Sequence, residues 1–302
     1  MTFTLWLERW RPLLPIPVLL VVLPCLWLMF RRTWYDLDAA SQRARAERLR
    51  LGQVDARPLV SLAVAAVILT MQEYYGGRVM YDRNIRPWLS DVCDARGWSE
   101  TFALFDELAG FYWWAITRIG GYLLPFVIWA FAFPRDSLLD LGLRTRGFVR
   151  HLWIYVFFLA VMLPMLFLMS RQSDFGSYYP FYRQASRSWF DFLAWEFIYF
   201  FQFFALECFF RGWWVGVLRD SMGSAAVFAM SVPYCMIHYG KPYLEANGAI
   251  VAGIALGSLA MRTKSIYSGF LVHVTVAGVM DWTSLAARHA LPTQMFPPGF
   301  HR

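Results

Sequence analysis

Long apolar runs separated by short polar segments are the dominant pattern of this 302-residue chain. A helix needs about 20 apolar residues to cross roughly 30 Å of hydrocarbon. We therefore predict an all-α fold, a polytopic transmembrane helical bundle with about eight spans, of which the second and seventh are short. The eight runs cover residues 13–30, 59–72, 118–133, 151–169, 192–218, 225–238, 249–261 and 266–282.

Composition agrees with a membrane protein. The chain has 58% hydrophobic and 16% charged residues, whereas a soluble domain carries roughly a quarter charged residues. The first run reads as a retained anchor rather than a signal peptide. Its apolar core is long, no small-residue cleavage site follows it, and Arg31 and Arg32 stop it.

The net charge of +7 is distributed by loop. Seven arginines lie in 31–57 and four in 134–150, whereas 73–110 holds four arginines against seven acids. This alternation is typical of the positive-inside rule and indicates no nucleic-acid partner. We expect an integral protein of the bacterial inner membrane, with both termini outside the cytoplasm.

Four parts are predicted along the chain. They are an N-terminal anchor span with a cytoplasmic helix (1–57), additional spans (58–190) with an outer loop region (73–110), a segment whose spans carry ionisable residues (191–283) and a C-terminal tail (284–302). Residues 34–52 within the first part read as a solvated helical linker.

Ionisable residues enter the apolar runs from residue 192 onward. Glu207 and Arg211 are four residues apart and share a helix face. A charge at mid-membrane costs at least about 2.5–3.5 kcal/mol, so both must face protein or water. An internal ion pair without reactivity explains this pair equally well. Glu196 lies near the predicted outer edge and reads as a boundary residue.

Two later runs carry histidines. Tyr234 and His238 are four residues apart at the end of the sixth run, after Pro233. His273 lies near the middle of the eighth run, and Asp281 follows it on the same stripe at i+8. Intramembrane histidine is rare and marks a functional site by default, although a histidine at a span end is commonly an interfacial hydrogen-bonding residue.

A carboxylate, two histidines and an arginine in neighbouring spans suit water activation. Glu207 can accept a proton from water, and a neutral histidine can orient that water or stabilise an oxyanion. Two histidines and one glutamate also match a zinc ligand set. Neither cofactor nor metal is expected, but Glu207, His238 and His273 are the ligands if zinc is present.

Three short motifs in this region match a family in order and spacing. LECFFRG, YCMIH and HVTVA resemble the motifs of the CAAX-protease and bacteriocin-processing (CPBP) family, over about residues 190–282. The resemblance makes 191–283 a CPBP-like catalytic core and implies intramembrane peptide-bond hydrolysis. It implies Glu207, His238 and His273 as catalytic residues, with Arg211 as partner of the glutamate. In the family, a motif glutamate and the second-motif histidine activate water, while the third-motif histidine stabilises the oxyanion.

The chain departs from the family pattern at two positions. Leu206 stands where the family has the first of two glutamates, and Ala277 stands where it has asparagine. Glu207 is then the remaining motif carboxylate, and Asp281 is a candidate supporting residue beside Tyr234 and Arg211. These departures leave open a catalytically inactive member that acts as a membrane scaffold or immunity protein.

The predicted function is therefore an intramembrane endopeptidase that cleaves a membrane-anchored or lipid-modified protein near a terminus. Its partners are that substrate and the lipid bilayer. A transporter with a proton relay is a weaker alternative, because no inverted repeat is visible. A cysteine protease using Cys208 is another. The four cysteines show no paired spacing, which argues against a disulfide framework or a thiolate metal site.

Overall fold

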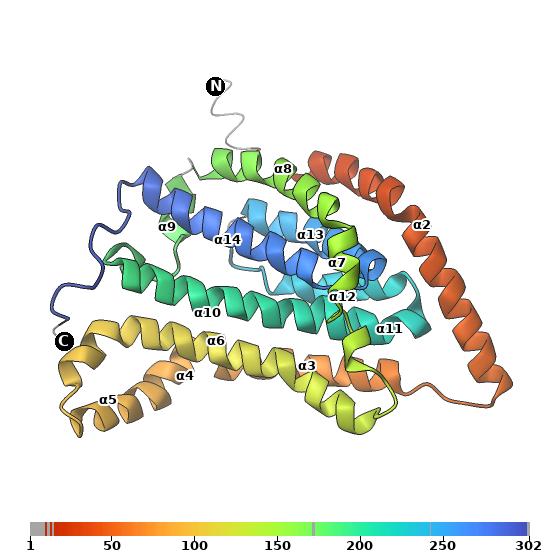
Figure 1. Ribbon diagram of the computed structural model, residues 1–302, viewed down its shortest axis with the longest axis horizontal. Helices are drawn as coiled ribbons and strands as arrows, with labels where there is room; N and C mark the ends of the chain where they lie inside the picture. The colour runs from red at the N-terminus through yellow and green to blue at the C-terminus, as the bar shows by residue number, and fades with distance from the viewer. Residues whose placement is uncertain (1–9, 11–12, 14, 171–172, 242, 301–302) are drawn as a thin grey trace. The chain divides into compact units, whose positions relative to one another are not determined.

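The computed structural model describes residues 10, 13, 15–170, 173–241 and 243–300 (Figure 1). Within these ranges the chain is helical and has no β-strand, and an isolated antiparallel bridge joins Leu143 and Ser265. The predicted all-α fold is confirmed.

The helices follow one another along the chain with short connections. In order they are α2 (Pro15–Arg50), α3 (Arg57–Tyr75), α4 (Arg78–Met80), η2 (Tyr81–Ile85), α5 (Arg86–Asp94), α6 (Ser99–Ala132), η3 (Leu138–Asp140), α7 (Arg146–Arg150), α8 (Leu152–Met169), α9 (Ser173–Tyr178), η4 (Arg183–Ser186), α10 (Trp189–Glu207), η5 (Cys208–Trp214), α11 (Val215–Met222), α12 (Ala225–Met236), α13 (Tyr243–Thr263) and α14 (Tyr267–Ala287).

Six helical segments among the described residues are long and apolar enough to cross a membrane, so the protein is an integral membrane protein. They are Pro15–Arg50, Arg57–Tyr75, Ser99–Ala132, Trp189–Met222, Leu244–Thr263 and Tyr267–Ala287. The two other predicted runs form shorter apolar helices, Leu152–Pro164 and Ala225–Met236. The second and seventh runs, expected to be short, lie in full-length helices because polar residues outside the apolar run continue each helix.

Backbone contacts divide the chain into two compact units. The first unit comprises residues 1–62, 137–150 and 210–268, and the second comprises 63–136, 151–209 and 269–302. The predicted core 191–283 contributes to both units. The domain boundaries drawn from the sequence stay predictions.

In the first unit, α2 packs along α11 and α13 (Figure 1). The Trp34 indole N–H donates to Ser258 Oγ on α13 at 2.8 Å. Asp38 accepts the backbone N–H of Ser224 at 2.7 Å, at the turn where Gly223 adopts a φ of +59°. The prediction that 34–52 is a solvated linker is therefore wrong for one face of the helix. Side chains on this face hydrogen-bond to α13 and to the turn between α11 and α12.

In the second unit, α6 and α10 lie side by side (Figure 1). Aromatic side chains fill the contact: Trp195 and Tyr199 stack with ring centroids 4.6 Å apart, and Trp195 also meets Phe111 edge-on at 4.9 Å. Ala277 of α14 is buried in the same cluster. This packing fixes α10, which ends at Glu207.

The start of α10 is held by a polar network. Ser188 is the N-cap and accepts the backbone N–H of Asp191 at 3.1 Å. The buried Asp191 carboxylate accepts hydrogen bonds from Tyr182, Ser188 and Arg187. This carboxylate raises the pKa of the Arg187 guanidinium above its ordinary value through their hydrogen bond. Capping and a charged pair near a helix N-terminus each stabilise it by about 1 kcal/mol.

The predicted outer loop region, 73–110, is itself helical and packs on the start of α6. The buried Tyr81 hydroxyl donates to Asp106 Oδ1 at 2.9 Å, and Arg86 Nε donates to Asp106 Oδ2 at 2.8 Å. Burial, followed by the hydrogen bond to Asp106, raises the pKa of Tyr81. The region is an ordered cap on α6 rather than an open loop.

Candidate functional site

Glu207 and His273 meet in the second unit. His273 Nδ1 lies 2.8 Å from Glu207 Oε1. Glu207 is the last residue of α10, and His273 lies two turns into α14. The carboxylate is fully buried, whereas the His273 side chain is 15% exposed. Two of the three predicted catalytic residues are therefore in direct contact.

The local sequence allows this contact. Gly269 lies one turn before His273 on α14, and a Cβ built there would collide with the Glu207 carboxylate. Phe203, one turn before Glu207 on α10, stacks on the His273 ring at 5.1 Å with an interplanar angle of 4°. The Glu207 carboxylate thus packs directly against the backbone at Gly269, where no Cβ is present. The Phe203 ring lies parallel to the His273 imidazole and restricts its orientation.

This geometry determines how His273 is used. His273 Nδ1 faces the Glu207 carboxylate at ion-pair distance. Nε2 lies on the opposite edge of the ring, away from Glu207. Such a pair has the arrangement of a base oriented by a carboxylate.

The first unit brings together Arg211, Tyr234 and His238. The fully buried Arg211 guanidinium lies 3.8 Å from the centre of the Tyr234 ring, a close cation–π contact. The Tyr234 and His238 rings lie 4.7 Å apart. Arg211 belongs to η5, a π-helical turn, and such turns are frequent at functional sites.

His238 lies in a turn beyond the last residue of α12, Met236, and not within a span. Its Nδ1 is 2.8 Å from the Tyr234 carbonyl oxygen. A carbonyl only accepts, so Nδ1 carries the proton and the lone pair of neutral His238 is on Nε2. That Arg211 and His238 act together with Glu207 stays a prediction.

The two positions that depart from the family pattern are both buried. Leu206 is 4% exposed and Ala277 is 5% exposed, the latter within the aromatic cluster. Asp281 is fully buried and accepts the Trp195 indole N–H at 2.7 Å. Glu196, expected at a boundary, is instead 5% exposed. Packing against other helices, which spacing along one helix does not reveal, explains this difference.

Metal and thiol chemistry find little support in the described part of the chain. No group of three or more His, Cys, Asp or Glu side chains that could hold a metal ion occurs there. Cys208 is buried at 1% exposure. Zinc binding by Glu207, His238 and His273 is untested, and elemental analysis of the purified protein would test it.

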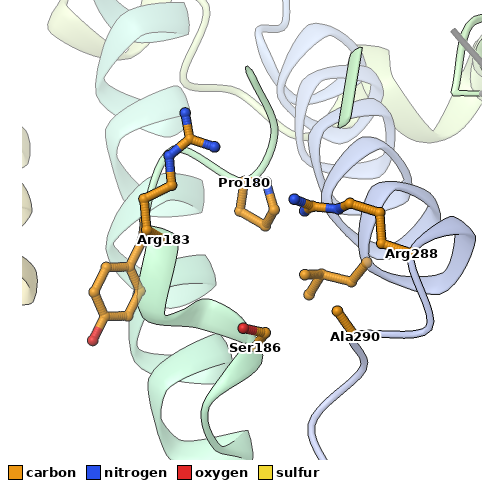
Figure 2. A pocket seen from close by; sticks show the side chains of 7 residues that line it. Pro180, Arg183, Ser186, Arg288 and Ala290 are labelled. Carbon is orange, nitrogen blue, oxygen red and sulfur yellow. The ribbon is translucent and has the colours of Figure 1, made fainter. Parts of the chain in front are cut away.

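A small cleft of about 50 Å³ lies at the end of α14. Figure 2 shows Arg183 and Arg288 on either side of Pro180, with Ser186 and Ala290 below. Leu285, which also lines it, is twelve residues after His273, or about 18 Å along the helix. The cleft is therefore remote from the Glu207–His273 pair.

The structure defines a polytopic helical membrane protein with a buried carboxylate–imidazole pair between two spans. Residues 188–279 match the family model described as type II CAAX prenyl endopeptidase Rce1-like. The match confirms, for this segment, the resemblance recognised from the three motifs. It supports a CAAX-type intramembrane protease kind of function, which implies a membrane-anchored protein substrate. Comparison with curated proteins and with solved structures gave no match.

Proposed function

We propose that this protein is an intramembrane endopeptidase that cleaves a membrane-anchored or lipid-modified protein near a terminus with an activated water. The observation that carries the proposal is the 2.8 Å contact between Glu207 and His273, inside the segment that matches the Rce1-like family. The family match indicates the class of reaction. The Glu207–His273 pair indicates which side chains activate the water.

In the proposed reaction, Glu207 and His273 act as one unit. Glu207 Oε1 faces His273 Nδ1 at 2.8 Å, and the imidazole ring is partly exposed, so it can meet the water. Nε2 accepts a water proton as the water oxygen attacks the peptide carbonyl carbon. The buried carboxylate stabilises the imidazolium that forms, and this imidazolium returns the proton to the leaving amine.

His238 joins the reaction as a second acceptor. Its Nδ1 proton is given to the Tyr234 carbonyl, so Nε2 offers a fixed lone pair that orients the water before attack. The cation–π contact between Arg211 and Tyr234 positions this second-motif histidine, because the Tyr234 ring lies against both side chains. The role of Arg211 as charge partner of Glu207 stays a prediction from the first motif.

The alternative is an inactive member that serves as a membrane scaffold or immunity protein. Leu206 and Ala277, at the two departing positions, favour it. They are packed apolar positions in this structure, so neither supplies a polar group to the site. The two functions make opposite predictions for Glu207.

The deciding experiment compares Glu207→Gln with the wild-type protein. Purified protein in bilayers is given a farnesylated C-terminal peptide and, separately, a protein with a C-terminal anchor. Gln keeps the size of the side chain but removes the negative charge, so cleavage should fall by about 10²–10⁴-fold while folding survives. Glu73→Gln, at a side chain that is 77% exposed, is the matched control and should cleave normally.

Two further variants separate chemistry from folding. His273→Ala should lose activity at normal protein yield. If Arg211 is the motif partner of Glu207, Arg211→Ala leaves a buried carboxylate uncompensated. The free energy of unfolding should then fall by about 3–5 kcal/mol, and the protein yield should fall with it. Full cellular function of Glu207→Gln at normal expression would exclude the role of Glu207 in activating water with His273 and favour the scaffold.

A further inference from the structure

Two arginines line the cleft at the end of α14, and the proposed mechanism uses neither. The cleft has a volume of about 50 Å³ and lies between η4, with the residues before it, and the segment that follows α14. Figure 2 shows the guanidinium groups of Arg183 and Arg288 on either side of Pro180, with Ser186 below. All of these residues belong to the second unit.

The Arg288 guanidinium is held in place by the protein. Its Nε donates to the Ser284 carbonyl oxygen at 3.1 Å, and its Nη2 donates to the Tyr179 carbonyl oxygen at 2.9 Å. The first bond covers a carbonyl at the C-terminal end of α14, whose partial negative charge would otherwise repel an anion. Nη1 makes no hydrogen bond with the described part of the chain, so its N–H groups are available to a ligand.

Arg183 carries a charge that the described residues do not compensate. Its backbone N–H donates to Glu107 Oε1 at 2.9 Å, but its guanidinium makes no hydrogen bond or ion pair with them. Arg187 differs, because its guanidinium pairs with the buried Asp191 carboxylate at 2.7 Å. Two cations that line one cleft repel each other, whereas an anion between them attracts both.

The cleft lies at the depth of lipid headgroups. The 21 residues of α14 rise about 31 Å, which matches the roughly 30 Å of the hydrocarbon core. Arg288 is the first residue after this helix, so it lies at a membrane surface. Exposed aromatic side chains occur at the same end, with Trp282 on α14 and Phe190 on α10. Aromatic residues at this depth are typical of the membrane–water interface.

The size and the donors of the cleft suit a phosphate group. A water molecule needs about 10–15 Å³ of such a volume, so a cleft of about 50 Å³ holds a group of about four oxygen atoms. Guanidinium groups match the oxygens of a phosphate with paired N–H donors. The phosphates of phospholipids are the anions most concentrated at the end of a spanning helix.

We propose that the cleft between Arg183 and Arg288 is a phosphate-binding site at the membrane surface, and that a phospholipid headgroup supplies the phosphate. Inorganic phosphate has the same chemistry, so the experiment distinguishes the two sources. A bound phosphate bridges η4 and the end of α14. The site does not depend on the proposed proteolysis.

The Arg183→Gln variant removes one of the two charges without disturbing the fold, because no hydrogen bond within the described chain uses the Arg183 guanidinium. Arg83→Gln is the matched control. Arg83 is an exposed arginine of η2 in the same unit, and its side chain also makes no hydrogen bond with the described residues. Both variants change the net charge equally, so a general attraction to anions affects them alike.

Native mass spectrometry of delipidated protein in detergent measures lipid binding during titration with phosphatidylglycerol. Wild type and Arg83→Gln should bind the lipid with equal affinity. Arg183→Gln should bind it about 10-fold more weakly, because a charge-assisted hydrogen bond is lost. Equal affinity of all three proteins, or an equal loss in both variants, would overturn a specific site.

Thermal unfolding of the same lipid-free protein measures the second source. Inorganic phosphate is compared with acetate at equal ionic strength, since salt screens exposed charges. Phosphate should compete with the lipid and stabilise wild type but not Arg183→Gln. Stabilisation of this kind without lipid binding would confirm the phosphate site and overturn the lipid as its source. Equal stabilisation by acetate and phosphate would overturn the phosphate site itself.

Discussion

Replacing Gly269 with alanine tests whether the Glu207–His273 contact depends on bare backbone. The new Cβ would lie 2.9 Å from the Glu207 Cδ and closer still to Oε2. The carboxylate is the far end of a flexible side chain, so it can swing away, but only by leaving His273. Losing a polar contact to a charged group costs about 1.5–3 kcal/mol, and the better helix propensity of alanine returns about 1 kcal/mol. The net loss of stability should be about 0.5–2 kcal/mol.

Activity should suffer much more than stability. Displacing the carboxylate that supports His273 by about 1 Å should lower the rate about 10²-fold, whereas the protein still folds. Cleavage of the anchored substrate and thermal unfolding in detergent measure the two effects. Gly120→Ala, at a helical glycine with nothing within 4 Å of the new Cβ, is the matched control and should gain up to about 1 kcal/mol at full activity. Wild-type cleavage by Gly269→Ala would refute the close approach of carboxylate and helix.

Other predictions address the first unit, topology and metal. Tyr234→Leu removes the ring under Arg211 and should lower thermal stability by up to about 2 kcal/mol, whereas Tyr234→Phe should not; equal stability of the two variants would rule out the cation–π contact. A reporter after Gly52 should lie in the cytoplasm and one near Gly97 outside, and the reverse pattern at both sites would invert the proposed orientation. Purified protein should carry no stoichiometric zinc by elemental analysis, and a zinc signal that His238→Ala abolishes would contradict this.

The fold and the motif positions are largely predictable because they depend on local composition. Apolar runs of membrane length give helices regardless of their partners, and the resemblance of LECFFRG, YCMIH and HVTVA locates the segment that the family model matches. Rarity of charge inside a membrane also singles out Glu207 and His273, which the structure brings together.

Features that depend on contacts between distant segments are not predictable in this way. The packing of α2 through Trp34 and Asp38 joins residues more than 180 positions apart, and one sequence gives no sign of it. Glu196 reads as a boundary residue in the sequence, whereas packing between helices buries it in the structure. The π-helical turn at Cys208–Trp214 likewise has no signature in hydrophobic periodicity, and it holds one of the predicted site residues.

The short helix α12 has a consequence for the backbone around His238. Its twelve residues rise about 18 Å, while the 21 residues of α13 that return beside it rise about 31 Å. The turn at 237–241 follows the short helix, and irregular backbone near a membrane persists only where protein or water satisfies its polar groups. Here the protein does so, because the backbone N–H groups of Ile237, His238 and Tyr239 donate to the carbonyl oxygens of Pro233, Cys235 and Met236. The second-motif histidine therefore leaves the helix without leaving its own peptide N–H group unbonded.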